Sequence, residues 1–289
     1  MSRAKKYKTI MSKDLALPHF EHAKKCTSAF SRKLEENSFI DKKVEEYKQN
    51  GFCEIWTEEQ SKLADKISSK VLDWDKEGKY FKDGIINIDS EIYNSIPEIE
   101  VLIKDSFSEF LQKSFNSEYK VFFSQIIKTE FNNSGPRGSQ LWHQDGGPGS
   151  AINALFYLRD IDKDGGAIEL IPWKDSLKIY KKVISNLSLY RLLRKRSAKE
   201  QTRSKKVELY EKEINPFYSQ YVHQPTGKSG LLVPFFNNVI HRGGFPKSPD
   251  KPRFVLLFYF YPSDKKTPFE KYRKEGFPKK SSYPKDPNF

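Results

Sequence analysis

Cysteine is scarce in this chain: Cys26 and Cys53 are the only two among 289 residues. Two thiols build neither a disulfide framework nor a cysteine-rich zinc site, which favours a reducing compartment. Long apolar runs are also lacking, since no stretch approaches the roughly 20 residues that a membrane-spanning helix needs. The N-terminal stretch 1–26 is basic but has no apolar block of the kind found in signal peptides. We therefore expect a soluble, cytoplasmic protein with no membrane span.

Acidic residues are too few to balance the basic ones, because 38 Asp and Glu against 51 Lys and Arg leave a net charge of +13. The excess is concentrated in residues 174–213, which hold 13 Lys or Arg against 5 Asp or Glu, a surplus of +8. This surplus favours an anionic partner, such as nucleic acid, a membrane surface, or a phosphorylated substrate or carrier. No standard motif for reading DNA or RNA accompanies it.

Histidine is also rare, with five residues, and two of them lie in the stretch HFEHAKKC. His19, His22 and Cys26 could form a metal cluster, but no fourth ligand stands nearby. The alternative, which we favour, is a mobile polar arm.

Helix signals dominate residues 1–118, which we expect to form an N-terminal arm and helices that pack on a core. Residues 1–50 are charged and weakly periodic, which predicts an arm with some helix. Thr57 and Gln60 make a capping-box pattern, and apolar residues then recur at the four-residue interval of a helix packed on one side. A second helix is expected to begin at Pro97, a residue that suits the first helical position.

Strand signals begin at Tyr119 and continue to residue 262. The short apolar or alternating runs, separated by turns rich in Gly, Pro, Asp and Asn, are YKVFFSQIIKTEF, AINALFYL, AIELIP, GLLVPFF and RFVLLFYFY. They predict a mainly β core, an antiparallel sandwich or barrel, with flanking helices. A basic helical insertion, residues 174–225, interrupts the core, and a Pro- and Lys-rich tail, residues 263–289, follows it.

Candidate metal ligands lie in the stretch SQLWHQDGG, residues 139–147. Residues i and i+2 of an extended segment point to the same face, so His143 and Asp145 are expected to converge. His241 follows the run GLLVPFF, and Arg253 begins the next run twelve residues later. If the intervening loop joins antiparallel neighbours, His241 and Arg253 face one cavity from adjacent strands.

Two histidines and one carboxylate are the facial ligand set of non-haem Fe(II) oxygenases. A guanidinium such as that of Arg253 is suited to bind the carboxylate of an anionic co-substrate at two points. The constellation resembles the Fe(II)/2-oxoglutarate-dependent dioxygenases. Within them, LWHQDGG…YLRDIDKDGGAIELIP and HRGGFP…PR are most similar to the phytanoyl-CoA dioxygenase-like family. The resemblance covers residues 119–262 without the insertion.

This resemblance implies a double-stranded β-helix, that is, a cupin-like jelly roll. It implies that His143, Asp145 and His241 bind Fe(II), that Arg253 pairs with the co-substrate 2-oxoglutarate, and that O2 is the oxidant. An alcohol then replaces an unactivated C–H bond. Because related halogenases carry a small residue at the position of Asp145, the intact acid favours hydroxylation or desaturation.

Two further residues are candidates for binding the oxo acid. Gln125 lies 18 residues before His143, on a strand where members of the family contact that co-substrate. Asn153 lies on the strand after the ligand pair and could point inward. Each could instead be an ordinary polar strand residue.

Three functions fit these observations. The first is an oxygenase of a small or carrier-bound, anionic metabolite, with the insertion as a mobile cover whose Arg191, Arg194, Lys195 and Arg196 recruit the substrate. The second is a basic protein that binds or modifies nucleic acid on the same scaffold. The third, a non-catalytic or isomerase-like cupin relative, is disfavoured because the ligand triad and the arginine are all present.

Overall fold

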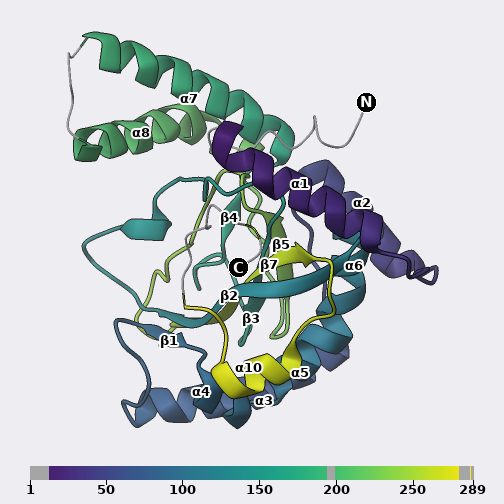
Figure 1. Cartoon of the computed structure of the whole chain (residues 1–289). Helices are drawn as coiled ribbons and strands as arrows, with labels where there is room; N and C mark the ends of the chain where they lie inside the picture. The colour runs from purple at the N-terminus through teal and green to yellow at the C-terminus, as the bar shows by residue number, and fades with distance from the viewer. Residues whose placement is uncertain (1–12, 194–198, 280–286, 288–289) are drawn as a thin grey trace.

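The computed structural model describes residues 13–193, 199–279 and 287. Figure 1 shows its helices and strands. Before the core come α1 (Lys13–Ala29), α2 (Ser38–Asn50), α3 (Glu58–Lys76), β1 (Ile85–Asn87), α4 (Ser90–Ser95), α5 (Glu98–Val101), the π-helical turn η2 (Leu102–Phe107) and α6 (Ser108–Phe115). The core and its insertion contain β2 (Glu118–Thr129), the 3-10 turn η3 (Gly138–Gln140), β3 (Ile152–Tyr157), β4 (Glu169–Leu170), α7 (Trp173–Leu193), α8 (Lys199–Ile214), η4 (Asn215–Phe217), α9 (Tyr218–Tyr221), β5 (Leu232–Phe236), β6 (His241–Arg242) and β7 (Arg253–Ser263), followed by α10 (Phe269–Glu275).

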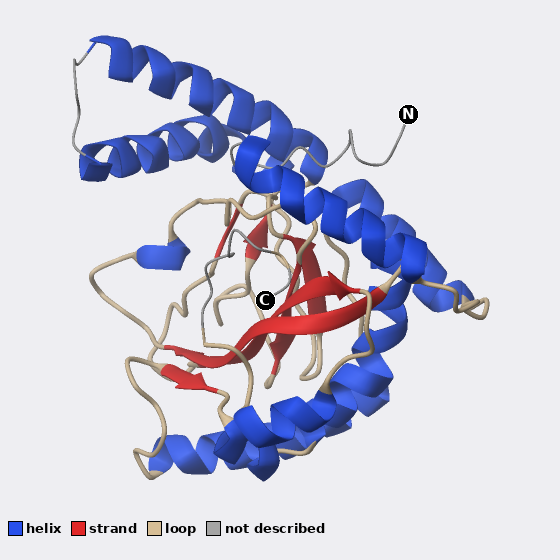
Figure 2. Cartoon of the chain, in the orientation of Figure 1, coloured by secondary structure: helices blue, strands red, loops and turns tan. Residues whose placement is uncertain are grey.

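Two antiparallel sheets form the core. The larger has the strand order β1-β2-β7-β3-β5, and the smaller pairs β4 with β6. Each of the five predicted apolar runs contains one of these strands, and β1 and β6 are additional short ones. The predicted fold class is confirmed: a jelly-roll core with flanking helices. Figure 2 shows the strands between helices above and below them, with mostly loops at the left of the view.

The two faces of the large sheet have different roles. On β7, Phe258 and Phe260 are fully buried and pack against Phe107 of η2, with ring centroids 5.3 and 5.1 Å apart. Side chains alternate between the faces of a strand, so Leu257 and Tyr259 point to the opposite face, where they are only partly buried. The sheet therefore turns one face to the helical layer and leaves the other for a site.

Helix α3 begins where the capping pattern predicts. The Thr57 hydroxyl accepts a hydrogen bond from the backbone N–H of Gln60 at 3.2 Å, which satisfies one of the free donors of the first turn. On the face predicted from four-residue intervals, Ile67 and Val71 are fully buried and Leu63 is partly buried against the same core. The predicted cap and the predicted buried face are both confirmed.

The stretch HFEHAKKC is not the mobile polar arm that we favoured. It belongs to α1, where His19 is fully buried and Cys26 is 1% exposed. The imidazole of His22 stacks on Tyr261 of β7 and lies within hydrogen-bond distance of the Pro262 carbonyl, at 3.1 Å. Helix α1 therefore packs on β7 through residues that the sequence alone suggested were exposed.

The insertion forms an antiparallel pair of helices, α7 and α8, that projects beyond the sheets in Figure 1. Residues 194–198 lie outside the described residues, and so do the side chains of 191–203. The side chains predicted to recruit the substrate, those of Arg191, Arg194, Lys195 and Arg196, therefore lie outside the described residues. In the described part of the chain, no helix is both long and apolar enough to cross a membrane.

Candidate metal centre

The backbone brings the histidines of the two predicted motifs side by side. His143 and His241 are antiparallel partners, and the N–H of each donates to the carbonyl of the other at 2.9 Å. The N–H of Asp145, two residues after His143, donates at 3.0 Å to the carbonyl of Asn237, four residues before His241. Strand β6 is in turn held by β4, because Leu170 pairs with His241. Main-chain bonds thus fix the spacing of all three candidate ligands.

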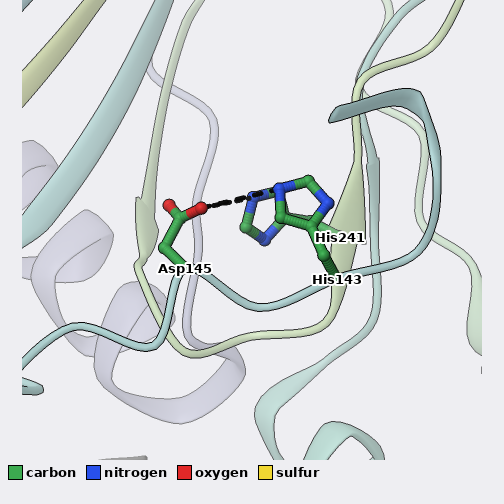
Figure 3. Close-up of side chains that lie close together, drawn as sticks. All are labelled: His143, Asp145 and His241. Carbon is green, nitrogen blue, oxygen red and sulfur yellow. Dashed lines mark ion pairs between the residues drawn. The ribbon is translucent and has the colours of Figure 1, made fainter. Parts of the chain in front are cut away.

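The three side chains converge, as Figure 3 shows. The Nε2 atoms of His143 and His241 lie 3.5 and 3.8 Å from Oδ1 of Asp145. One ligand atom from each residue lies within 4.8 Å of the other two, and among the described residues this is the one such cluster of His, Cys, Asp or Glu. His19, His22 and Cys26 therefore do not form a second cluster of this kind.

Both imidazoles are oriented by the same local bond. Nδ1 of His143 donates to the carbonyl of Leu141 at 2.7 Å, and Nδ1 of His241 donates to the carbonyl of Val239 at 2.9 Å. In each case the acceptor is two residues upstream. A neutral imidazole that donates from Nδ1 keeps a lone pair on Nε2, which is the form that binds a metal.

The electrostatics of the cluster favour an ionised acid beside a neutral imidazole. Burial lowers the pKa of His241 to about 4. Burial acts to raise the pKa of Asp145, but the two imidazoles and the Asn153 amide outweigh it and hold that pKa below its usual range. Burial acts to lower the pKa of His143, but the hydrogen bond and charge of Asp145 outweigh it and raise that pKa.

Asp145 is held through its second oxygen by the large sheet. The amide of Asn153, on β3, donates to Oδ2, and the hydroxyl of Tyr259, on β7, lies 3.5 Å from the same atom. Asn153 and Tyr259 are cross-strand partners, so one rung of the sheet supplies both contacts. Oδ2 is therefore engaged by the sheet, while Oδ1 faces the imidazoles. Tyr259 was not among the predicted site residues, although it shares a strand face with Arg253, six positions away.

Arg253 begins β7 and is 8% exposed. Its Nη1 and Nη2 donate to the carbonyl of Gly166 at 2.6 Å and to the hydroxyl of Thr129 at 2.9 Å. Within the described part of the chain, its Nε has no hydrogen-bond partner and no carboxylate forms an ion pair with it. Burial lowers the pKa of the guanidinium.

The prediction that His241 and Arg253 lie on adjacent strands is wrong. β6 pairs with β4 in the small sheet, whereas β7 is flanked by β2 and β3 in the large one. The loop between them, residues 243–252, therefore crosses from one sheet to the other. The guanidinium still lies beside the chain that follows His241, because a Cβ built on Gly243 would be 3.6 Å from its Nη2. Gly243 comes directly after β6, two residues and at most roughly 7 Å beyond His241.

Glycine allows this crossing loop to pack closely. A Cβ on Gly244 would lie 2.1 Å from the carbonyl of Ala167, so only a residue without a side chain fits. The adjacent Gly166 carbonyl is the one that accepts from Arg253. The GG pair of HRGGFP thus lets β6 approach the loop that orients the arginine.

Gln125 lies on β2, where it pairs with Leu257 of β7. Leu257 is two residues from Tyr259 on the same strand, so Gln125 shares the face that carries Tyr259 and Asn153. Its amide donates to Oδ1 of Asn87 at 2.8 Å. The structure thus turns Gln125, Asn153 and Arg253 to one face of the sheet, and of these three, among the described residues, only Asn153 hydrogen-bonds to a candidate ligand.

Two cavities adjoin these residues. One, of about 440 Å³, is lined by His143 and Asp145 and by Lys206, Val207 and Tyr210 of α8. The other, of about 600 Å³, reaches Arg253 from the side of α3, and none of the triad lines it. We assign the chemistry to the first cavity, because the candidate metal ligands lie there.

The insertion packs directly behind the candidate ligands. A hydrophobic cluster joins the neighbours of the two histidines, Trp142 and Ile240, to the helices; its other buried members are Ile171, Ile179, Val183, Leu187, Leu209, Tyr210 and Ile214. The hydroxyl of Tyr210 also donates to Oε1 of Gln144 at 2.9 Å. Helix α8 is therefore attached to the segment that carries His143 and Asp145. The sequence does not reveal this contact, because the insertion's stripe shows an apolar face but not its partner.

No family model matches the sequence, and no curated protein matches it either. Solved structures do share its fold. One is EctD from S. alaskensis with 2-oxoglutarate and 5-hydroxyectoine, at 15% identity and a TM-score of 0.51, over 81% of this chain and 80% of EctD. Another is SnoN, a non-heme alpha ketoglutarate-dependent epimerase from nogalamycin biosynthesis, at 10% identity and a TM-score of 0.50, over 78% of this chain and 82% of SnoN. At identities this low, the structural similarity shows a shared fold and nothing more.

Proposed function

We propose that this protein is an Fe(II)- and 2-oxoglutarate-dependent oxygenase that hydroxylates a C–H bond of a small metabolite. The observation that carries the proposal is the convergence of two Nε2 atoms and one carboxylate oxygen. They come from His143, His241 and Asp145, each held in place by its backbone. Two nitrogens and one carboxylate, arranged on one side of a metal, leave coordination positions for a co-substrate and O2.

The donor set fits a metal ion. Two atoms that are each about 2.1 Å from a metal lie at most about 4.2 Å apart, and the separations of 3.5 and 3.8 Å to Oδ1 of Asp145 fall within that limit. Bonds from Nδ1 of each histidine leave Nε2 as the donor. The acid is supported by Asn153, as is usual for metal-bound carboxylates.

Arg253 supports 2-oxoglutarate as the co-substrate. A buried cation without an acidic partner is costly, so its presence favours an anionic ligand. The guanidinium lies next to Gly243, two residues after His241, and is proposed to bind the far carboxylate of a short diacid held at the metal. Gln125 and Asn153 share this face and are proposed to contact the same ligand or the carboxylate of Asp145.

Bound iron would supply the oxidising chemistry, in which O2 and 2-oxoglutarate are consumed and a C–H bond becomes an alcohol. The residues of this chain orient the three ligands, hold the distal carboxylate of 2-oxoglutarate at Arg253, and shape the cavity at His143. Intact Asp145 favours hydroxylation over halogenation. A phytanoyl-CoA dioxygenase-like assignment rests on the motifs around these residues. Both cysteines are free and buried, which fits a reducing compartment such as the cytoplasm.

The size of the cavity favours a small or carrier-bound substrate over a polymer. Small-molecule sites are typically about 300–1,000 Å³, and the cavity beside His143 is about 440 Å³. The basic insertion keeps nucleic acid as the second candidate, in which a single base would enter that cavity. A non-catalytic role does not account for the buried Arg253, which forms an ion pair with no acid among the described residues.

The test is turnover of 2-oxoglutarate to succinate without a substrate, followed by a screen of metabolites for stimulation. We expect slow succinate formation that requires Fe(II) and that His143→Ala abolishes. His223→Ala is the matched control, because His223 is an exposed histidine paired with Glu54. Wild-type protein that neither binds nor consumes 2-oxoglutarate in the presence of iron would refute the proposal. Stimulation by an oligonucleotide instead of a metabolite would favour the second candidate.

A further inference from the structure

We propose that Lys206, from the helical insertion, binds an anionic group of the substrate beside the metal centre. The inference rests on the proposed function for the identity of the centre, and it adds the residue that recognises the substrate. The ligand class is a small molecule that carries a carboxylate, phosphate or sulfate group.

The position of Lys206 is the first argument. Lys206 and Val207 lie on α8, far along the chain from the triad, yet they line the cavity of about 440 Å³ together with His143 and Asp145. A substrate that enters this cavity therefore meets the lysine and the metal ligands together.

The rotation of α8 is the second argument. Tyr210 is fully buried, and its hydroxyl donates to Gln144, the residue between the two ligands of the H-x-D motif. Residues four apart lie on the same helix face, so this bond also turns Lys206 toward the cavity. Nζ of Lys206 lies 5.6 Å from the centroid of the Tyr210 ring. The lysine is thus presented by a helix whose orientation is fixed at the metal centre.

The charge balance of the cavity is the third argument. Of the described residues that line it, Lys206 is the one Lys or Arg and Asp145 the one Asp or Glu. Asp145 is engaged by the imidazoles through Oδ1 and by Asn153 through Oδ2. An oxyanion of the substrate would complement the positive charge that Lys206 brings to the cavity. Strong salt dependence is not expected, because the site is partly enclosed.

The experiment measures binding of matched probes to full-length, metal-free protein by isothermal titration calorimetry. The probes are benzoate, phenyl phosphate and the neutral benzamide. We expect wild-type protein to bind one or both anions at least tenfold more tightly than benzamide. Lys206→Ala should remove that preference and Lys206→Arg should keep most of it. A preference for phenyl phosphate over benzoate would assign a phosphorylated substrate, and the reverse a carboxylate.

Two further variants make the result specific. Lys205→Ala is the matched control, because Lys205 is adjacent on α8 but pairs with Glu208 and is absent from the cavity lining. Arg253→Ala tests whether the anions bind at Arg253 and not at Lys206, because only binding at the arginine would be lost in this variant. Equal anion affinity in wild type and Lys206→Ala, or a loss that follows Arg253→Ala alone, would overturn the proposal. Because no metal is present, these results stand apart from succinate formation, which tests the oxygenase proposal.

Discussion

Asp145 divides its two oxygens between two tasks. Oδ1 faces the imidazoles, and Oδ2 accepts from the fully buried amide of Asn153. Groups that orient a metal-bound carboxylate typically contribute 10–100-fold to metal affinity. The placement of Asn153 therefore has a measurable consequence for metal binding.

Asn153→Ala should weaken metal binding by roughly tenfold or more. The dissociation constant of Mn(II), a redox-inert probe under these conditions, measures the effect. Tyr259→Phe is the graded control, because its contact to Oδ2 is longer, 3.5 Å, and its loss should matter less. Unchanged affinity in Asn153→Ala would show that Asp145 needs no support from β3.

Arg253 is a buried cation whose desolvation is not offset by an acid among the described residues. Arg253→Met should therefore leave the melting temperature of the ligand-free protein within a few degrees of wild type, because removing such a charge offsets the loss of two hydrogen bonds. The stabilisation that 2-oxoglutarate confers in the presence of Mn(II), about 2.7 kcal/mol at a hundredfold excess over Kd, should disappear. Thermal denaturation with and without 2-oxoglutarate checks both parts. A full ligand-induced shift in the variant would mean that another cation binds the co-substrate.

The sequence predicted the three candidate ligands and the arginine because their signals are local. His143 and Asp145 are two residues apart, so in an extended segment they point to the same face. His241 and Arg253 each lie next to an apolar run. Lys206 and Tyr210 could not be predicted, because their place at the cavity depends on how α8 packs. Tyr259 could have been found from its even spacing to Arg253 along one strand.

Individual elements carry their own stability signals, and α3 is the clearest. Thr57→Ala should lower the free energy of unfolding by about 1 kcal/mol, because the N–H of Gln60 loses its acceptor. Thr57→Ser keeps the oxygen and should have little effect. Urea denaturation of the two variants measures the difference, and equal midpoints would show that the cap contributes nothing.

The helical layer is also joined by an ion-pair network at Glu100 of α5. Arg273 of α10 binds both carboxylate oxygens, at 2.5 and 3.0 Å, and Lys104 and Tyr93 bind one each. Burial acts to raise the pKa of Glu100, but these donors outweigh it and lower that pKa from 4.5 to about 2. Since the pKa is lower in the folded state, the stabilisation is complete above pH 4.5 and is lost as the pH falls toward 2.

Glu100→Gln should accordingly reduce stability by roughly 1–2 kcal/mol at pH 7, less than the full free-energy equivalent of this shift, because the partners Arg273 and Lys104 are about half exposed and solvent screens their ion pairs. The difference in the free energy of unfolding between the variant and wild type should become smaller as the pH falls from 4.5 to 2. Chemical denaturation at pH 7, 4 and 3 follows it. If the difference in the free energy of unfolding does not depend on pH, the destabilisation comes from lost packing and not from the charge of Glu100.

Short elements show where sequence patterns fail. β4 and β6 have two residues each and β1 has three, too few for periodicity to identify. β6 is the most important of these strands, because its pairing with β4 puts His241 in the small sheet. The prediction that His241 and Arg253 lie on adjacent strands is wrong for this reason. The buried histidines of α1 were missed for a related reason: their partners, Tyr261 and Pro262, lie more than 200 residues away.

In the molecule as a whole, the β core could be predicted from the sequence, whereas the packing of the insertion helices α7 and α8 could not. Five apolar runs and their turns indicated an antiparallel β core, since burial on both faces leaves a strong signal. The order β1-β2-β7-β3-β5 pairs strands from opposite ends of the core and could not be deduced from local patterns. The surplus of positive charge indicated an anionic ligand, and the structure adds a specific lysine at the cavity.

The central claim is that one site of this molecule binds iron and 2-oxoglutarate together, and anaerobic absorption spectroscopy tests it most directly. Adding Fe(II) and 2-oxoglutarate to the full-length protein should produce a weak charge-transfer band that needs both components. His143→Ala and Asp145→Ala should abolish the band, while His223→Ala should retain it. Wild-type protein that shows no band, and no affinity for 2-oxoglutarate in the presence of Fe(II), would contradict the account.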